Sequence, residues 1–123
     1  MRIEVIQDVF QLAQVFAISR GARTQAHVLT ATITDGDLTG WGECVPYARY
    51  GETLDSVTAE IEGLPAELTR EDLYDLLPAG AARNAVDCAL WDLEAKRAGK
   101  RVWEMAGLSA PGPEITAIGR AHV

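Results

Sequence analysis

The chain has 123 residues, of which 48% are hydrophobic and 24% are charged, and it carries a net charge of -7. This length allows one hydrophobic core, and this composition excludes a disordered chain, a collagen-like fibre and a disulfide-dense scaffold. The negative charge argues against nucleic acid and anionic membranes as partners, because both require clustered Lys and Arg side chains.

The first half of the sequence has the polar and apolar alternation of β-strands. The alternation predicts a first strand near residues 2–12, and its interruption at residues 18–24 predicts a loop. It returns over residues 29–34, where a second strand is expected. The Asp35-Gly36 pair then favours a tight hairpin turn before a third strand over residues 38–44. We therefore expect an antiparallel meander of three strands.

From Thr53 onward the apolar residues recur with a helical period. A first helix is predicted from this point to the stop at residues 63–65. Residues 69–72 resemble a capping box and predict the start of a short second helix. The longest helix is predicted over residues 81–98, because its apolar residues form one stripe, and Gly99 provides its end.

One further helical turn is expected around residues 102–106, and Ala110-Pro111-Gly112-Pro113 has the composition of a connector. The predicted fold class is α+β, with a three-stranded antiparallel meander followed by a small helical bundle. We expect residues 1–113 to form one domain and residues 114–123 to be a tail.

Cys44 and Cys88 are the two cysteines of the chain. Cys44 follows a strand-like run and Cys88 lies in an Ala-rich helical segment, so both are expected to be buried thiols in the core. Neither a signal-peptide profile nor a bilayer-spanning apolar stretch is present. These features favour a soluble protein in a reducing cytoplasm.

Few residues offer metal or nucleophilic chemistry. The two histidines, His27 and His122, do not combine with other ligands at a metal-binding spacing, so no metal site is expected in this chain. The acidic residues are spread over predicted helix surfaces, where they are usually solvated. Gly40 and Gly42 begin a G-x-G pattern that Pro46 interrupts, so they are expected to permit a strand bulge or close packing. No catalytic residue is predicted.

Two loops have residues suited to binding. One contains Arg20 and Arg23, and the other, over residues 45–53, contains Arg49 and Tyr50. The Arg guanidinium matches a carboxylate, and Tyr adds an apolar ring with a polar tip, so both loops could bind an anionic and partly apolar small molecule. The alternative, that these are ordinary solvated loop residues, stays open from the sequence pattern.

Two stretches resemble a known family. Residues 40–53, which end in R-Y-G-E-T, are similar to the segment that closes the meander in the amino-terminal capping domain of the mandelate racemase and muconate lactonizing enzyme group of the enolase superfamily. Residues 82–96, followed by Gly99 and Val102-Trp103-Glu104, are similar to the long helix and the short next helix of that domain. The R-Y-G-E-T ending most resembles dipeptide epimerases.

The resemblance implies a function for the two loops. In this family the capping domain covers the mouth of a catalytic barrel and supplies two specificity loops, which correspond here to residues 18–24 and 47–53. It implies a dipeptide substrate, contacts from Arg20, Arg23, Arg49 and Tyr50, and epimerisation by removal of an α-proton, as in L-Ala-L-Glu becoming L-Ala-D-Glu. It also implies Mg²⁺ and catalytic lysines, all on the barrel, so no cofactor is expected on this chain.

The sequence stops where the family would enter the barrel. We therefore expect a gene truncation, a frameshift or a fragment, and a chain that does not turn over substrate by itself. The alternative is a stand-alone binding or assembly module that has the loops without the chemistry. In either case an open apolar surface favours a homo-oligomer, for example a dimer.

Overall fold

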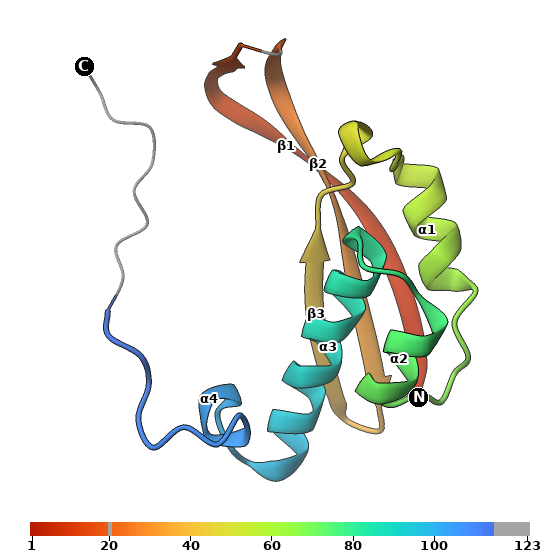
Figure 1. Cartoon of the computed structure of the whole chain (residues 1–123), viewed down its shortest axis with the longest axis vertical. Helices are drawn as coiled ribbons and strands as arrows, with labels where there is room; N and C mark the ends of the chain where they lie inside the picture. The colour runs from red at the N-terminus through yellow and green to blue at the C-terminus, as the bar shows by residue number, and fades with distance from the viewer. Residues whose placement is uncertain (20, 115–123) are drawn as a thin grey trace.

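The computed structural model describes residues 1–19 and 21–114, which form one sheet with helices on one of its faces (Figure 1). The sheet has the order β1-β2-β3, and both strand pairs are antiparallel. The strands are β1 (Arg2–Ile18), β2 (Gly21–Asp35) and β3 (Leu38–Cys44). The helical elements are the 3-10 turn η1 (Ala48–Tyr50) and the helices α1 (Leu54–Glu62), α2 (Arg70–Leu76), α3 (Ala81–Ala98) and α4 (Val102–Met105).

The predicted class, an α+β fold with a meander followed by helices, is confirmed, and the described residues contain no (β/α)-barrel. The bounds predicted for the third strand and for the longest helix are those of β3 and α3. None of the helices in the described part of the chain is both long and apolar enough to cross a membrane. Most of the predicted tail, residues 115–123, and with it His122, lies outside the described residues.

The β1–β2 hairpin is longer than predicted. Strand β1 continues to Ile18 instead of ending near residue 12, and β2 already begins at Gly21. The predicted loop over residues 18–24 is therefore wrong in its extent, because Ile18 and Gly21 still pair across the hairpin. The polar and apolar alternation that marks a strand is lost along the apolar run at residues 15–18. The sequence pattern therefore predicted that the first strand ends earlier than it does. The long ribbon projects beyond β3 and the helices (Figure 1).

The core lies between the sheet and the helices. Leu29, Ala31 and Ile33 of the central strand β2 are at most 1% exposed. Alternate residues of β1, such as Ile3 and Val5, are packed against the same cluster. The remaining buried members come from the end of β3, from the helices and from the segments between them: Cys44, Val57, Ile61, Leu68, Leu73, Leu77, Ala82, Ala85, Val86, Ala89, Leu90 and Leu93.

Helix α3 lies directly on the backbone of β3. A Cβ atom placed on Gly42 would lie 1.9 Å from the carbonyl oxygen of Ala85, and one placed on Gly40 would lie 2.0 Å from that of Ala89. These distances are far below van der Waals contact, so only glycine fits at either position. The prediction that Gly40 and Gly42 permit close packing is thereby confirmed.

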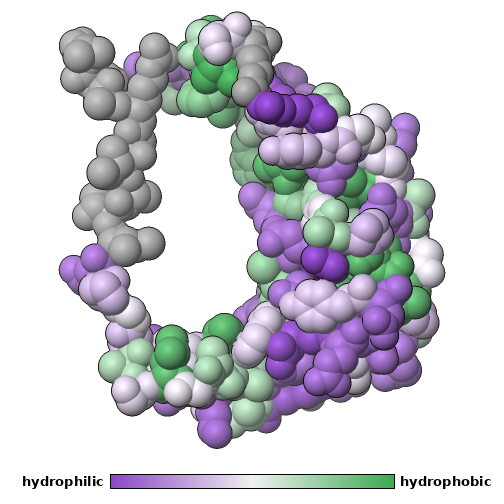
Figure 2. Space-filling model, in the orientation of Figure 1, coloured by the Kyte–Doolittle hydropathy of each residue, from purple (hydrophilic) through white to green (hydrophobic). Residues whose placement is uncertain are grey.

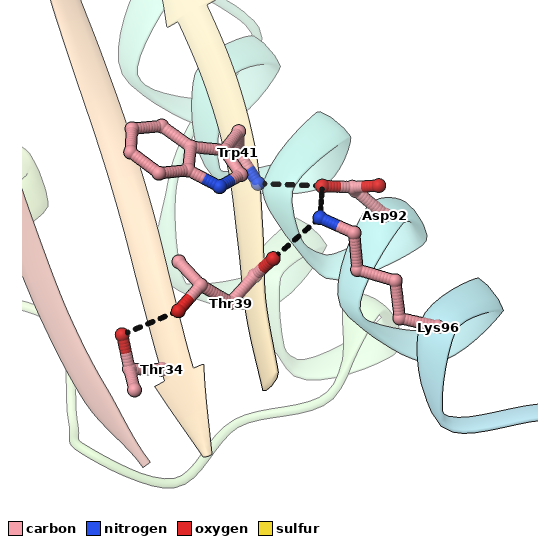
Figure 3. A network of polar contacts seen from close by, with 5 residues as sticks. All are labelled: Thr34, Thr39, Trp41, Asp92 and Lys96. Atoms are coloured by element: carbon pink, nitrogen blue, oxygen red, sulfur yellow. Dashed lines mark hydrogen bonds and ion pairs between the residues drawn. The ribbon is translucent and has the colours of Figure 1, made fainter. Parts of the chain in front are cut away.

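Side chains of α3 also form hydrogen bonds with backbone groups on the free edge of β3 (Figure 3). The Trp41 N–H donates to Asp92 Oδ2 at 2.9 Å, and Lys96 Nζ donates to the Thr39 carbonyl oxygen at 2.6 Å and to Asp92 Oδ2 at 2.8 Å. An edge strand otherwise presents unpaired backbone groups that attract other chains. The Asp92 and Lys96 side chains therefore fix α3 in place and protect this edge.

Local signals set the starts of α1 and α2. The capping box predicted at residues 69–72 is confirmed: Asp72 N–H donates to Thr69 Oγ1 at 3.1 Å, and Thr69 N–H donates to Asp72 Oδ2 at 2.8 Å. A second capping box, which sequence reasoning missed, pairs Thr53 with Ser56 at the start of α1. Both give the first turn the acceptors that a helix N-terminus lacks.

Candidate functional site

A large irregularity in the β1–β2 hairpin shapes the candidate site. Gln11 pairs with Gln25 and Phe16 pairs with Arg23, so residues 12–15 of β1 stand opposite Thr24 alone. A bulge of this kind bends its strand and disrupts the ladder locally. Beside it lies an open hollow with a volume of about 560 Å³. Its lining comes from both strands and from the segment after β3: Leu12, Ala13, Gln14, Phe16, Ile18, Gly21, Ala22, Arg23, Gln25, Ala26, Val45 and Tyr47.

The lining of this hollow is mostly apolar. Phe16 and Ile18 remain about half exposed, at 50% and 48%, although they are large hydrophobic side chains. Figure 2 shows hydrophobic side chains at the same projecting end of the β1–β2 ribbon. Exposed apolar clusters of this kind mark surfaces that bind a ligand or another protein segment.

Arg23 and Tyr47 bring the two predicted loops together at this hollow. The Arg23 Cζ atom lies 5.7 Å from the centroid of the Tyr47 ring, which is within the range of a cation–π contact. The Tyr47 and Tyr50 ring centroids are also 5.7 Å apart. An exposed guanidinium therefore stands beside an aromatic ring at the edge of an apolar hollow. This arrangement suits a ligand with a carboxylate and an apolar part.

The loop that carries the two tyrosines is held by its own backbone. Tyr50 N–H donates to the Tyr47 carbonyl oxygen at 2.9 Å, and Gly51 N–H donates to that of Ala48 at 3.0 Å. Gly51 has φ of 74°, a left-handed conformation that glycine adopts without strain. Thr53 then caps α1. The Tyr47 and Tyr50 rings are thus presented by a closed turn between β3 and α1.

A second hollow of about 380 Å³ is lined by residues of this turn and by residues at the N-terminus of α3. The buried Cys44 lines it. Burial, reinforced by the carboxylates of Glu52 and Glu43, raises the pKa of the Cys44 thiol to about 11. The thiol therefore stays protonated at neutral pH and is a poor nucleophile.

Cys88 corrects one prediction. Its side chain is exposed rather than buried in the core, whereas Cys44 is buried as predicted. The apolar stripe of α3 runs through Ala85 and Ala89, and Cys88 precedes Ala89 by one residue, which places it about 100° away around the helix. A cysteine in an Ala-rich helix is thus buried only when it lies on the stripe.

The four residues predicted to contact substrate occupy different positions. Arg23 lines the larger hollow, and Tyr50 lines the smaller one and is 75% exposed. Arg49 lies in η1, is exposed and lines neither of these two hollows. Arg20 lies outside the described residues.

Sequence reasoning missed several residues of the larger hollow, chiefly Leu12 and Phe16, and it did not single out Val45 or Tyr47 within their loop. One signal was available. The run of apolar residues over residues 15–18 is not part of the predicted core pattern, and an apolar run that breaks a strand pattern can mark a bulge with an exposed hydrophobic lining.

Metal ligands are not grouped in the described region. Within residues 1–19 and 21–114, no three His, Cys, Asp or Glu side chains come together in a group that could hold a metal ion.

The fold and the hollow define a class of protein, a small capping-type α+β domain whose meander carries helices on one face and two loops at one end. The family model described as "Mandelate racemase / muconate lactonizing enzyme, N-terminal domain" matches residues 1–107. The chain belongs to this family, and it corresponds to the N-terminal domain of enolase-superfamily enzymes that resemble dipeptide epimerases.

Three relatives illustrate the similarity. The L-Ala-D/L-Glu epimerase of Escherichia coli (strain K12) is 43% identical over 119 residues, which cover 94% of this chain and 37% of that protein. An enolase family member from Agrobacterium tumefaciens with homology to dipeptide epimerases, with bound sodium and L-Ala-L-Glu, is 54% identical with a TM-score of 0.84, over 89% of this chain and 34% of that one. The dipeptide epimerase from Methylococcus capsulatus, complexed with Mg and L-Arg-D-Lys, is 29% identical with a TM-score of 0.75. This match covers 86% of this chain and 34% of that one. The chain spans about a third of the length of these relatives.

Proposed function

We propose that this chain is the capping, substrate-specificity domain of a magnesium-dependent dipeptide epimerase whose substrates carry an acidic residue, such as L-Ala-L-Glu. The observation that carries the proposal is the position of Arg23, whose guanidinium lies beside the Tyr47 ring at an apolar hollow where the two loops meet. The similarity to the two relatives named for, or bound to, Ala-Glu dipeptides supports the same substrate class. Arg20, Arg49 and Tyr50 belong to the proposal as further contacts.

In the proposed reaction, the proton on one α-carbon of the dipeptide is removed and returned on the opposite face, and the enediolate formed between the two steps is stabilised. The described lining of the larger hollow has no carboxylate, histidine or lysine that could move this proton, and an arginine does not deprotonate in proteins. The contribution of this domain is therefore to bind the dipeptide, orient it and exclude water. The bases and the magnesium ion are assigned to the barrel.

We expect the chain by itself to show no catalysis. When it is incubated with L-Ala-L-Glu and Mg²⁺ in D₂O, exchange of the α-protons, followed by NMR, should not exceed the rate in a sample without protein. The physical reason is that the binding residues of the hollow lack a base positioned for proton transfer. Measurable exchange would contradict the assignment of the bases to another domain.

Replacement of Arg23 with Ala should weaken binding of L-Ala-L-Glu by about 10- to 100-fold, because one charge-assisted hydrogen bond contributes roughly 1.5–3 kcal/mol. The measurement is a titration of the 123-residue chain followed by isothermal calorimetry. Arg2→Ala is the matched control, since Arg2 is exposed at the other end of the sheet beside Glu4. L-Ala-L-Gln, which lacks the side-chain charge, should bind the unaltered chain weakly.

The same titration addresses the alternative of a stand-alone binding module, in which Arg20→Ala and Arg49→Ala should also abolish binding. Absence of binding at millimolar dipeptide would contradict both that alternative and the assignment of the carboxylate to Arg23. The cytoplasmic location and the homo-oligomer stay predictions.

A further inference from the structure

Glu52 connects the loop of the two tyrosines to the start of the longest helix. Its Oε2 atom accepts the Ala81 N–H at 2.7 Å, and its Oε1 atom accepts the Tyr47 N–H at 3.1 Å. The Glu52 N–H in turn donates to the Tyr47 carbonyl oxygen at 3.3 Å. One partly buried carboxylate therefore closes the loop on itself and joins it to α3, 29 residues further along the chain.

Helix α3 has no side-chain cap of its own at its N-terminus. Its N-cap residue is Gly80, which has no capping side chain, and its first turn contains no acidic residue. The N-terminus of an 18-residue helix has unsatisfied N–H groups and a partial positive charge, which a nearby side-chain oxygen or a negative charge usually balances. Glu52 supplies both from the loop.

The other end of this connection is closely packed. Helix α3 rests on the backbone of β3, where Gly42 lies against Ala85 in the second turn of the helix, and Asp92 and Lys96 hold the helix to β3 further along. The residue held at the loop end, Tyr47, lines both hollows and stacks its ring near Arg23. The position of the Tyr47 ring is thus set through its backbone by Glu52.

We propose that Glu52 is a positioning residue for the substrate loop, which holds Tyr47 and Tyr50 in their binding arrangement by linking the Tyr47 and Ala81 amides. This inference rests on the proposed function for its effect on dipeptide binding. The link itself is tested without any ligand. Because both carboxylate oxygens already accept backbone N–H groups, Glu52 acts through Tyr47 rather than as a substrate ligand.

The first experiment measures amide hydrogen exchange by NMR in the 123-residue chain. Glu52→Ala should raise the exchange rates of the Tyr47 and Ala81 amides by about tenfold or more, because local opening exposes amides that have lost their acceptor. Glu52→Gln retains one acceptor oxygen and should protect only one of the two amides. Glu60→Ala, which removes an exposed acid of α1, is the matched control and should change neither amide.

A second variant separates loop positioning from helix capping. Gly80 has an extended backbone, and a Cβ atom there would meet only Glu52 Oε2, at 3.2 Å, which Glu52→Ala removes. Gly80→Ser in the Glu52→Ala background gives α3 a local N-cap. The new hydroxyl would accept the N–H of Ala82 or Arg83, the second and third residues of α3, so we expect this double variant to regain the melting temperature. The Tyr47 amide should stay unprotected, and any affinity for L-Ala-L-Glu should stay reduced by about tenfold.

Two outcomes would overturn the proposal. One is Tyr47 exchange within about twofold of the unaltered chain in Glu52→Ala. The other is recovery of Tyr47 protection and of dipeptide affinity by Gly80→Ser, which would show that Glu52 only caps the helix. If the unaltered chain does not bind L-Ala-L-Glu, the substrate assignment fails, and the exchange rates alone still decide the role of Glu52.

Discussion

Gly42→Ala is expected to cause a large loss of stability. The new Cβ would lie 1.9 Å from the Ala85 carbonyl oxygen and 2.9 Å from both the Ala85 carbonyl carbon and the Ala89 amide nitrogen. All three are backbone atoms, so no side chain can rotate to make room, and α3 must move away from β3. The expected cost is about 3 kcal/mol or more, a large part of the 5–15 kcal/mol that roughly bounds the stability of a domain.

Thermal unfolding followed by circular dichroism measures this effect. Each kcal/mol lowers the melting temperature of a small domain by roughly 4–8 °C, so Gly42→Ala should lower it by at least about 12 °C or abolish the transition. Gly112→Ala adds the same methyl group where no other atom lies within 4 Å, and it should leave the melting temperature nearly unchanged. Equal melting temperatures for the two variants would contradict the close contact between α3 and β3.

The parts of the fold that follow from local chemistry could be predicted from the sequence. The stripe of α3 and its glycine end require only helical spacing, and the Thr69 capping box requires only residues three positions apart. The Asp35-Gly36 pair likewise marks the β2–β3 hairpin, where Gly36 has a left-handed φ of 59°. In each case the residues that determine the structure are neighbours in the sequence.

The candidate site depends instead on contacts between distant residues. The bulge at residues 12–15 is set by which β2 residues pair on either side of it, and the apolar run beside it does not reveal that register. The proximity of Arg23 to Tyr47 follows from the way the long hairpin passes the end of β3. Sequence reasoning could identify both loops as suitable for binding, and it could not show which of their residues meet.

The same dependence on tertiary contacts applies to Glu52. In the sequence it is one of 18 acidic residues, and the R-Y-G-E-T stretch gives no local reason to relate it to a helix that begins at Ala81. The reason lies in the missing N-cap side chain at Gly80, which a long-range acceptor replaces. Helix ends without a local cap therefore indicate where long-range polar contacts should be sought.

Ile33→Ala is the second substitution that should have a large effect. We expect it to lower the free energy of unfolding by about 2–5 kcal/mol. Ile33 is 0% exposed on the central strand β2, on the face that the helices cover, and its side chain is among the largest that are fully buried in the described residues. Truncation removes apolar surface from the core and leaves a cavity, which the close packing of α3 on β3 prevents from collapsing. Urea unfolding should show a lower midpoint with an unchanged slope.

Ile6→Ala provides the control on the same sheet. Ile6 lies on β1 and is 51% exposed, with its side chain on the face opposite Ile3 and Val5, which pack against the core. Its truncation removes the same number of carbons and leaves no enclosed cavity, so the loss should stay within about 1 kcal/mol, the span of strand propensities. The difference between the two isoleucines measures what the helices contribute by covering one face of the sheet. Similar losses for both would mean that the helices do not enclose Ile33 in solution, and the support that α3 gives to the Tyr47 loop would then be missing as well.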